Sequence, residues 1–412
     1  MLKSRVGHMQ LTQKIRIFPT SEQEETLWKL SEKCRLIYNF ALAERREAWE
    51  NGVKGITYTK QQNDLPKIKE QYPEYKWVYS KVLQHVLRTL NANYKSFFAL
   101  RRNGYKDAQP PKFKGKNYFT TMVYNQSGFK IEKGKITFSQ FYNTIPLTFT
   151  IPEKFSFEDK KVIQFSISAK SKQKRYFVSV TYEGEEKPYI DNGLYQAIDL
   201  GISKTVTAVN THGKFFEAVN PRPDKYWNAK VDAVQSRRDH CKKGSKKWKR
   251  LHKALKTCKK KCTHQIRDFQ HKLSRKMVDN TKANTIIIGD LDVKEMAQSE
   301  KTTKGLNRST QNNGYLSRFA RFLTYKAQLA GKKVIEISER NTSKNCYACG
   351  EEHDMPLWKR NMECDCCGNE IDRDRNSAIN IMTRFLSQNG MWTGYQRFVG
   401  NLRKTGLPQV VV

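Results

Sequence analysis

The sequence predicts a multidomain α/β protein, and three observations lead to this prediction. The chain has 412 residues, which is more than one ordinary domain needs. From about residue 191 onward, short apolar runs typical of strands alternate with segments of helical periodicity. Two Cys-x-x-Cys pairs interrupt this alternation and predict a small zinc-binding module inserted into that domain, over residues 340–372.

The N-terminal half predicts a β domain that carries a helical insert. Residues 10–20 (QLTQKIRIFPT) alternate like a strand, and residues 120–185 are rich in strand patterns with glycine turns. Between them, Ser21 and Glu24 predict a capping box, and a helical stripe follows through Leu27, Leu30, Cys34, Ile37 and Phe40. A second helix is expected over about 78–100. We therefore expect a β-barrel-like domain from 1–20 and 119–190, with a helical domain over 21–118 inserted in it.

The C-terminal half, residues 191–412, predicts an α/β sheet. Its expected strands are YQAID (195–199) and the hairpin strand after it, TIIIGDL (285–291) and KKVIEIS (332–338). A long basic helical pair is expected over about 228–280, with an apolar stripe of helical period and lysines on its other faces. The strands and the helical pair together predict a sheet covered by helices, with a strongly basic surface on the helical pair.

The charge of the chain predicts a polyanionic partner. Lysine and arginine total 76 against 40 aspartate and glutamate, a net charge of +36. Nucleic acid is the partner that such an excess favours, with an anionic membrane surface as the alternative; no apolar run is long enough to span a bilayer, so we expect no membrane partner. Lys259, Lys260 and Lys261 are expected to contact the nucleic-acid backbone, and the alternative is a solvated helix face.

Four of the nine cysteines have the spacing of a metal site. Without a secretory signal, cysteine use of this kind favours a reducing compartment over a disulfide framework. Four thiolates complete a tetrahedron and leave no open position, so the expected zinc is structural. Cys366 is an alternative ligand in the second pair, but the repeated C-x-x-C-G pattern favours the set Cys346, Cys349, Cys364 and Cys367.

Two aspartates have the sequence context of ligands for a hard cation. Asp199 closes the strand YQAID before a glycine, and Asp374 lies at the expected start of a helix. Hydrolysis of a phosphodiester without a covalent intermediate commonly uses two divalent ions about 3.5–4 Å apart, held by carboxylates, and Mg²⁺ prefers such oxygen ligands. The alternative for Asp374 is a plain helix N-cap. Because Asp374 occurs together with Asp199 and the cysteine module, we favour a metal ligand over a plain N-cap and expect a metal-dependent nuclease.

The chain resembles the transposon-encoded TnpB proteins, which are RNA-guided DNA nucleases related to type V CRISPR effectors. The resemblance covers nearly the whole length and rests on KIRIFPT, LIYNFALAER, LNANYKSFF, PPKFKGK, AIDLGIS, RDFQHKLSRKMV, GDLDVKEM, TSKNCYACG and CDCCGNEIDRDRNSAIN. It implies an oligonucleotide-binding wedge domain with an inserted recognition domain, followed by an RNase H-like (RuvC) nuclease domain with a zinc ribbon. It also implies a guide RNA as cofactor, Mg²⁺ for catalysis, and double-stranded DNA opened beside a short flanking motif as substrate.

The resemblance also implies which residues contact nucleic acid, the oligomeric state of the protein and its location in the cell. The helix around Gln84 is expected to face the flanking motif, where glutamine pairs with adenine; the alternative is a solvent-facing side chain. Phosphate contacts are expected from Lys95 and from the proline-rich loop, through Lys112, Lys114 and Lys116. The protein is expected to act as a monomer within its ribonucleoprotein, in the prokaryotic cytoplasm near the nucleoid. A transposase that joins DNA ends is a weaker alternative.

One position departs from the family pattern. The family's second catalytic strand normally ends in glutamate, and the matching residue is Gly289, which cannot bind a metal. Asp290 is adjacent but is expected on the opposite face of the strand. Glu339, at the end of KKVIEIS, is the expected replacement, which gives a site of Asp199, Glu339 and Asp374. The alternative is a relative that has lost cleavage and acts as an RNA-guided DNA-binding repressor.

Overall fold

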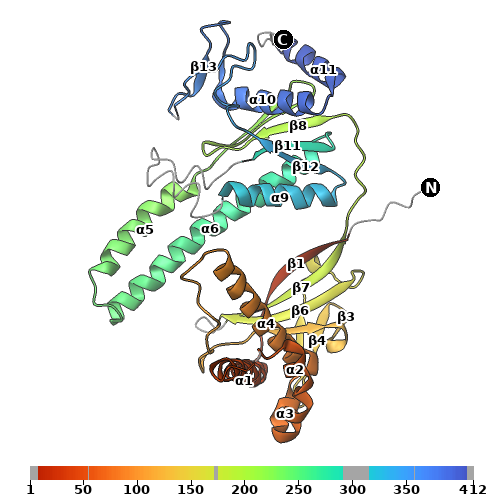
Figure 1. Cartoon of the computed structure of the whole chain (residues 1–412), viewed down its shortest axis with the longest axis vertical. Coiled ribbons are helices and arrows are strands. Elements are labelled where there is room, and N and C mark those ends of the chain that lie inside the picture. The colour runs from red at the N-terminus through yellow and green to blue at the C-terminus, as the bar shows by residue number, and fades with distance from the viewer. Residues whose placement is uncertain (1–7, 54, 171–174, 291–314, 357, 406–412) are drawn as a thin grey trace, which may run out of the picture. The chain divides into compact units, whose positions relative to one another are not determined.

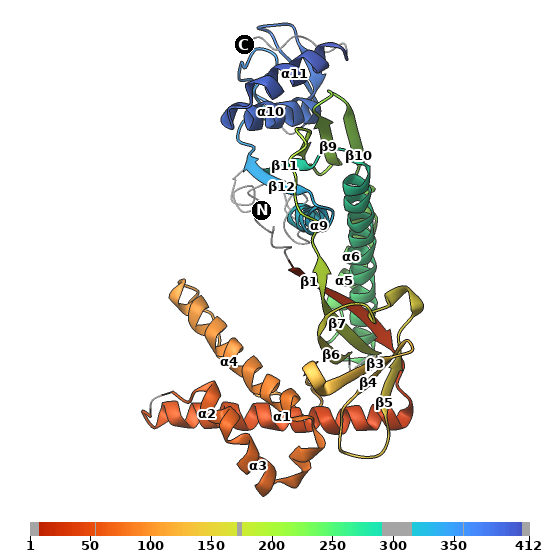
Figure 2. The same ribbon diagram turned by 90° about the vertical axis from the view of Figure 1, so that its right-hand side faces the viewer.

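The computed structural model describes residues 8–53, 55–170, 175–290, 315–356 and 358–405, which form two compact units. The first unit spans His8–Gly184, and the second runs from Glu185 to the C-terminal helix. Figures 1 and 2 show the helices and strands of each unit in two views. None of the described helices is long and apolar enough to span a bilayer.

The first unit contains two antiparallel sheets around one core. A four-stranded sheet has the order β1–β7–β6–β2, with bounds His8–Ile17, Arg175–Glu185, Val162–Lys170 and Met122–Asn125. A three-stranded sheet is formed by β3 (Phe129–Glu132), β4 (Lys135–Phe138) and β5 (Leu147–Thr150). Strand β1 precedes the helices in the chain and its sheet partners follow them, so both flanks build one β region. Among the described residues the strands form two hydrogen-bonded sheets and not one closed barrel.

Four α-helices lie between these strands in the chain: α1 (Ser21–Glu50), α2 (Tyr58–Asn63), α3 (Leu65–Gln71) and α4 (Ser80–Arg102). The capping box of α1 is one residue earlier than predicted. Thr20 accepts from the Gln23 backbone N–H at 3.2 Å, and the Gln23 side chain accepts from the Thr20 N–H at 3.1 Å. The predicted stripe of α1 is buried apart from Phe40, whose exposed fraction is 54%.

The second unit is built on a five-stranded sheet of order β10–β9–β8–β11–β12. The strands are β8 (Tyr195–Asp199), β9 (Lys204–Asn210), β10 (Phe215–Val219), β11 (Thr285–Asp290) and β12 (Lys333–Ser338). Strands β8, β9 and β10 form an antiparallel meander, whereas β11 runs parallel to both β8 and β12. The long basic helices are α5 (Pro223–Asp239) and α6 (Lys246–Asn280).

Helices cover both faces of this sheet (Figure 2). Ala197 and Ile287 pack with α10 (Arg373–Gln388) and α11 (Trp392–Arg403). Ile198 and Ile288, which are their neighbours in the chain, pack instead with α6 and α9 (Tyr315–Leu329). Because successive side chains of a strand point to opposite faces, this packing fixes the face of every strand residue. The short hairpin of β13 (Asn361–Glu363) and β14 (Glu370–Asp372) precedes α10.

Candidate active site and metal centre

The carboxyl ends of β8, β11 and β12 meet at one edge of the sheet. Asp199 is the last residue of β8, and Glu339 directly follows β12. In the parallel register Gly289 of β11 lies beside Ile337 of β12. Asp199, Gly289 and Glu339 are each two residues beyond a side chain that packs toward α10, so they belong to the α10 face of the sheet. Asp290 is exposed and has the parity of the opposite face.

The side chain of Glu339 lies over the backbone of Gly289. A Cβ atom placed on Gly289 would be 2.3 Å from Glu339 Oε2 and 3.0 Å from Glu339 Cβ. The first distance is shorter than real Cβ contacts and the second is tighter than most of them, and the φ angle of Gly289 is not in the left-handed region. Glycine at this position therefore leaves room for the Glu339 side chain and does not serve a special backbone conformation. The volume that a side chain at 289 would take is filled by the Glu339 carboxylate.

Asp374 completes the group from α10. Asp372 is the N-cap of that helix, and its side chain accepts from the backbone N–H groups of Asp374 at 3.0 Å and Arg375 at 3.2 Å. The capping role is thus filled by Asp372, so the Asp374 carboxylate is not used to cap the helix. Asp199, Glu339 and Asp374 line one cavity of about 320 Å³.

Burial dominates the electrostatics of these carboxylates. It raises the pKa of Asp199 to about 7, with a further rise from the Asp374 charge and an opposing hydrogen bond from Ser377 at 2.9 Å. Burial, with the charge of Asp290, likewise raises the pKa of Glu339 to about 7. Burial also raises the pKa of Asp374, against the opposing charge of Arg360.

The donor set fits a divalent cation. Glu339 Oε2 is buried, and no described residue forms a hydrogen bond with it. A buried, unsatisfied carboxylate oxygen next to a second carboxylate of raised pKa is stabilised by a bound cation. The three carboxylates do not bring their oxygen atoms as close together as the ligands of one enclosed metal ion. Among the described residues, only the four thiols discussed below place three or more possible metal-ligand atoms all within 4.8 Å of one another.

Three further polar residues in the cavity were not found by sequence reasoning. Arg360, which directly precedes β13, forms an ion pair with Asp374. Arg373 lines the cavity and donates to the Pro356 carbonyl at 3.0 Å. The position of Ser377 was readable, because it is three residues after Asp374 on one helix face. No local signal points to Arg360, since its position depends on how the hairpin folds back.

The cysteine cluster comes from residues 346–367, which lie in the sequence between two segments that line this cavity. The Sγ atoms of Cys346, Cys349, Cys364 and Cys367 all lie within 4.8 Å of one another, and exposed Cys366 is outside the set. Gly350 and Gly368 follow the two knuckles with φ angles of 82° and 68°, a region that glycine adopts without strain. Burial raises the pKa of the Cys349 and Cys367 thiols, whereas at Cys364 hydrogen bonds from the Cys367 backbone, neighbouring thiols and His353 outweigh burial and lower the pKa to about 6. A thiolate at neutral pH is the form that binds metal.

Two asparagines of α10 connect the first knuckle to the carboxylate cavity. Asn376 Nδ2 donates to the carbonyls of Thr342 at 3.1 Å and Asn345 at 2.8 Å, and its Oδ1 accepts from the Tyr347 backbone N–H at 2.9 Å. Asn380 donates to the same two carbonyls at 2.8 and 2.7 Å. The helix that carries Asp374 is thus hydrogen-bonded directly to the segment that carries Cys346.

The predicted nucleic-acid residues divide into exposed and packed side chains. Lys95, Lys112, Lys116, Lys259, Lys260 and Lys261 are exposed, whereas Gln84 is half-buried on α4. Lys114 is also half-buried: its Nζ lies 3.8 Å from the ring centroid of Tyr38, and burial lowers its pKa to about 8. The Lys114 carbonyl accepts from Arg35 at 2.9 Å and from Asn39 at 3.0 Å. Lys114 therefore anchors the proline-rich loop to α1, a role that the sequence did not reveal.

Three sequence models of protein families match separate parts of the chain. They are described as "Cas12f1-like, TNB domain" at residues 317–381, "Probable transposase" at 178–300 and "Helix-turn-helix domain" at 9–54. The first covers the knuckle Cys346–Cys349 and Asp374, and the second covers Asp199. The third spans β1 and the single helix α1 in this structure.

Relatives of known description extend over nearly the whole chain. A "Putative RNA-guided DNA endonuclease" of Streptomyces pristinaespiralis is 28% identical over 386 residues, covering 92% of this chain and 90% of that protein. The "Putative RNA-guided DNA endonuclease InsQ" of Escherichia coli K12 is 26% identical and covers 90% of each. Among solved structures, a chain of a "Cas12f1-sgRNA-target DNA complex" matches with a TM-score of 0.55 at 13% identity, over 91% of this chain and 98% of that one, which is a likeness of fold.

Proposed function

This chain belongs to the family of transposon-encoded TnpB proteins, and on that premise we propose that it is an RNA-guided endonuclease that cleaves double-stranded DNA beside a short flanking motif. The strand order β10–β9–β8–β11–β12 with helices on both faces supports an RNase H-like (RuvC) nuclease domain in the second unit. The β sheets and helices of the first unit support a wedge domain with a recognition insert. The net charge of +36 supports guide RNA and DNA as partners. We propose further that the protein acts as a monomer in the prokaryotic cytoplasm.

One observation carries the proposal that cleavage is retained. The Glu339 carboxylate occupies the space that Gly289 leaves free, in the cavity that also contains Asp199 and Asp374. A protein that had simply lost a catalytic glutamate at 289 would have no reason to place a buried, unpaired carboxylate there, because such a group costs free energy. The site retains three carboxylates, with one supplied by the neighbouring strand.

In the proposed mechanism, Asp199, Glu339 and Asp374 would hold divalent cations, with Mg²⁺ as the expected ion. When bound, such ions supply charge for the transition state and lower the pKa of a coordinated water. Ser377 donates to Asp199 and so fixes the orientation of that carboxylate. Arg360 and Arg373 give the cavity positive charge, which suits the scissile phosphate; Arg360 must then leave its pairing with Asp374. The four cysteines would hold a structural zinc, and the hydrogen bonds of Asn376 and Asn380 connect α10 to the segment of the first knuckle.

Loss of cleavage is the second candidate function, and Gly289 is the observation that favours it. In that case the protein binds DNA that matches its guide RNA, does not cut it, and acts as a repressor. The two functions share every nucleic-acid contact and differ only in whether phosphodiester bonds break.

The experiment uses the purified ribonucleoprotein with the RNA that co-purifies. Its target is a duplex matched to that RNA and flanked by a randomised segment, so that the flanking motif need not be known. We expect cutting with Mg²⁺ by the wild type. Asp199→Asn, Glu339→Gln and Asp374→Asn should each slow cutting by about 10²-fold or more, because metal-held charge is worth several kcal/mol. DNA binding should be nearly unchanged in all three variants.

Asp290→Asn is the matched control, since Asp290 is an exposed carboxylate one residue from Gly289. It should cut at nearly the wild-type rate. If Asp290→Asn fails to cut while Glu339→Gln cuts, the third ligand is misassigned. If the wild type binds a matched duplex but does not cut it with Mg²⁺ or Mn²⁺, the repressor function holds.

A further inference from the structure

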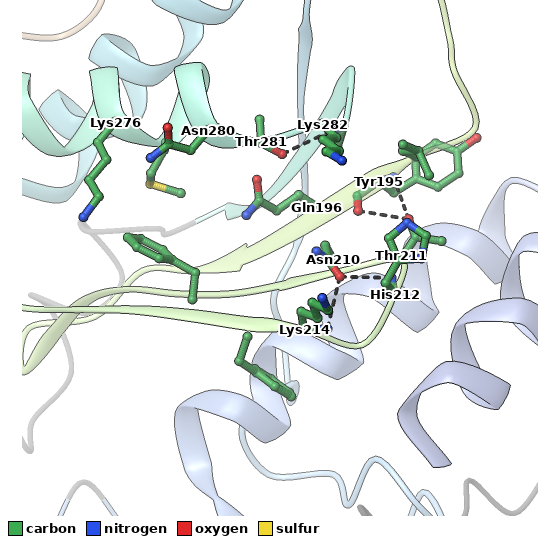
Figure 3. Close-up of a pocket in the computed structure, with 15 residues that line it drawn as sticks. Tyr195, Gln196, Asn210, Thr211, His212, Lys214, Lys276, Asn280, Thr281 and Lys282 are labelled. Atoms are coloured by element: carbon green, nitrogen blue, oxygen red, sulfur yellow. Dashed lines mark hydrogen bonds between the residues drawn. The ribbon is translucent and has the colours of Figure 1, made fainter. Parts of the chain in front are cut away.

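A second and larger cavity lies at the opposite end of β8 from Asp199. Its volume is about 590 Å³, and three segments of the second unit line it: the start of β8, the turn between β9 and β10, and the end of α6 with the residues after it (Figure 3). Tyr195 begins β8 and lines this cavity, while Asp199 ends the strand and lines the carboxylate cavity. At about 3.3 Å per residue these ends are roughly 13 Å apart, so the two cavities are separate.

The lining is positively charged. It includes three lysines, Lys214, Lys276 and Lys282, and none of the lining residues is acidic. No described carboxylate forms an ion pair with any of the three lysines. Their charges are therefore not neutralised within the described chain, and an anion is the expected counterpart.

The negative end of the α6 dipole does not cancel this charge. Helix α6 ends at Asn280, beside the cavity, where its last carbonyl groups would disfavour an anion. Lys332 donates to the carbonyls of Thr281 at 2.7 Å and Ala283 at 3.0 Å, directly after the helix. This ammonium group offsets the negative charge at the helix end.

The same cavity offers an aromatic surface and amide groups. Phe215 and Phe216 are half-buried in its wall, and Lys276 Nζ lies 5.8 Å from the centre of the Phe216 ring. Gln196 lies between Asn280 and Asn210 in Figure 3. Gln196 Oε1 is buried, and no described residue donates to it. An unpaired buried acceptor costs free energy, and a ligand that carries an N–H group relieves that cost when the amide turns toward it.

We infer that this cavity binds a single nucleotide, with its phosphate near Lys276 and Lys282 and its base against Phe216 and within reach of the Gln196 amide. Lysine charge, a half-buried ring and the unpaired amide oxygen of Gln196 together match the three parts of a nucleotide that proteins recognise: charge, aromatic face and base edge. An unpaired nucleotide of the bound RNA and a free nucleotide have the same chemistry. We assign the RNA as the source, and this assignment rests on the proposed function.

The first arm of the test uses the full-length protein, freed of RNA at high salt. Equilibrium dialysis with radiolabelled AMP, GMP, CMP and UMP measures binding, with inorganic phosphate as a separate probe. The double variant Lys276→Ala/Lys282→Ala should weaken nucleotide binding at least tenfold. Phe216→Leu, which keeps an apolar side chain but removes the ring, should weaken it by about 5- to 100-fold and leave phosphate binding unchanged. Lys130→Ala/Lys135→Ala, two exposed lysines of strands β3 and β4 outside the cavity, is the control and should bind as the wild type does.

The second arm identifies the source. The intact ribonucleoprotein is irradiated at 254 nm, and cross-linked peptides are identified by mass spectrometry. A nucleotide attached within 209–217 or 276–283 supports the RNA as the source. Nucleotide binding without such a cross-link refutes that source and leaves a free-nucleotide site.

Two results overturn the inference itself. The first is that the four nucleotides bind no better than inorganic phosphate, which would leave a simple anion site. The second is that pocket variants and the control bind nucleotides equally. If the protein proves to carry no RNA, the proposed function fails, but the dialysis arm still decides whether the cavity takes a nucleotide.

Discussion

A methyl group added at Gly289 tests directly whether Glu339 lies over β11. Gly289→Ala places a Cβ 2.3 Å from Glu339 Oε2 and 3.0 Å from Glu339 Cβ. To relieve the first contact the buried Glu339 side chain must leave its rotamer, whereas the contact with Cβ is relieved by a shift of a few tenths of an ångström. Overpacking of this kind costs about 1–3 kcal/mol. In the Glu339→Ala background the carboxylate is gone and only the 3.0 Å contact remains, so we expect the cost to fall below about 1 kcal/mol.

The assay is hydrogen exchange of the β11 amides, residues 285–290, because a protein with two compact units does not give a single unfolding transition. Strand β6 in the other unit is the internal reference. Gly400→Ala is the matched control, since nothing lies within 4 Å of its added Cβ and it lies within helix α11; it should be neutral or stabilising. Equal effects of Gly289→Ala in the wild-type and Glu339→Ala backgrounds would refute the placement of Glu339.

Three further predictions concern metal, salt and pH. Elemental analysis should find one zinc per chain, which Cys364→Ser removes and Cys366→Ser leaves, because only Cys364 belongs to the cluster. Replacing Lys259, Lys260 and Lys261 by alanine should reduce the salt slope of nucleic-acid binding by about 2 to 3, and an unchanged slope would assign them to a solvated helix face. Folding raises the pKa of Asp199 and Glu339 to about 7, so without divalent ions the stability of the second unit should fall as pH rises from about 4 through 7. Asp199→Asn should flatten that fall, Mg²⁺ should reverse it above pH 7, and thermal unfolding that is independent of pH would contradict it.

Much of the second unit was predictable because its signals are local. The apolar runs that form β8, β11 and β12 are each bounded by turn residues. The two knuckles are recognisable from the spacing of their cysteines and from Gly350 and Gly368. Strand parity also placed Asp290 on the opposite face of β11 from Gly289. In the first unit, the capping box moved from Ser21 to Thr20, because neighbouring Thr-Ser and Gln-Glu residues give equivalent patterns one residue apart.

The remainder depended on contacts between distant segments. Periodicity placed Phe40 on the buried stripe of α1, yet 54% of it is exposed, because no described element covers the helix at that point. Charge placed Lys114 on the surface, whereas the loop folds its side chain onto Tyr38. Arg360 pairs with Asp374 only because the β13–β14 hairpin returns to the start of α10. The cavity around Gln196 joins residues more than 80 positions apart, and no sequence pattern marks it.

The contact between Gly289 and Glu339 also limits how this protein can evolve. A carboxylate at 289 and one at 339 would claim the same volume with like charges, so a chain carrying both is overfilled and a chain carrying neither lacks a ligand. Single substitutions in either direction therefore pass through an unfit intermediate. The two arrangements of the glutamate are separated by a fitness valley, which makes the residue pair at 289 and 339 a marker of shared descent that is harder to reverse than either residue alone.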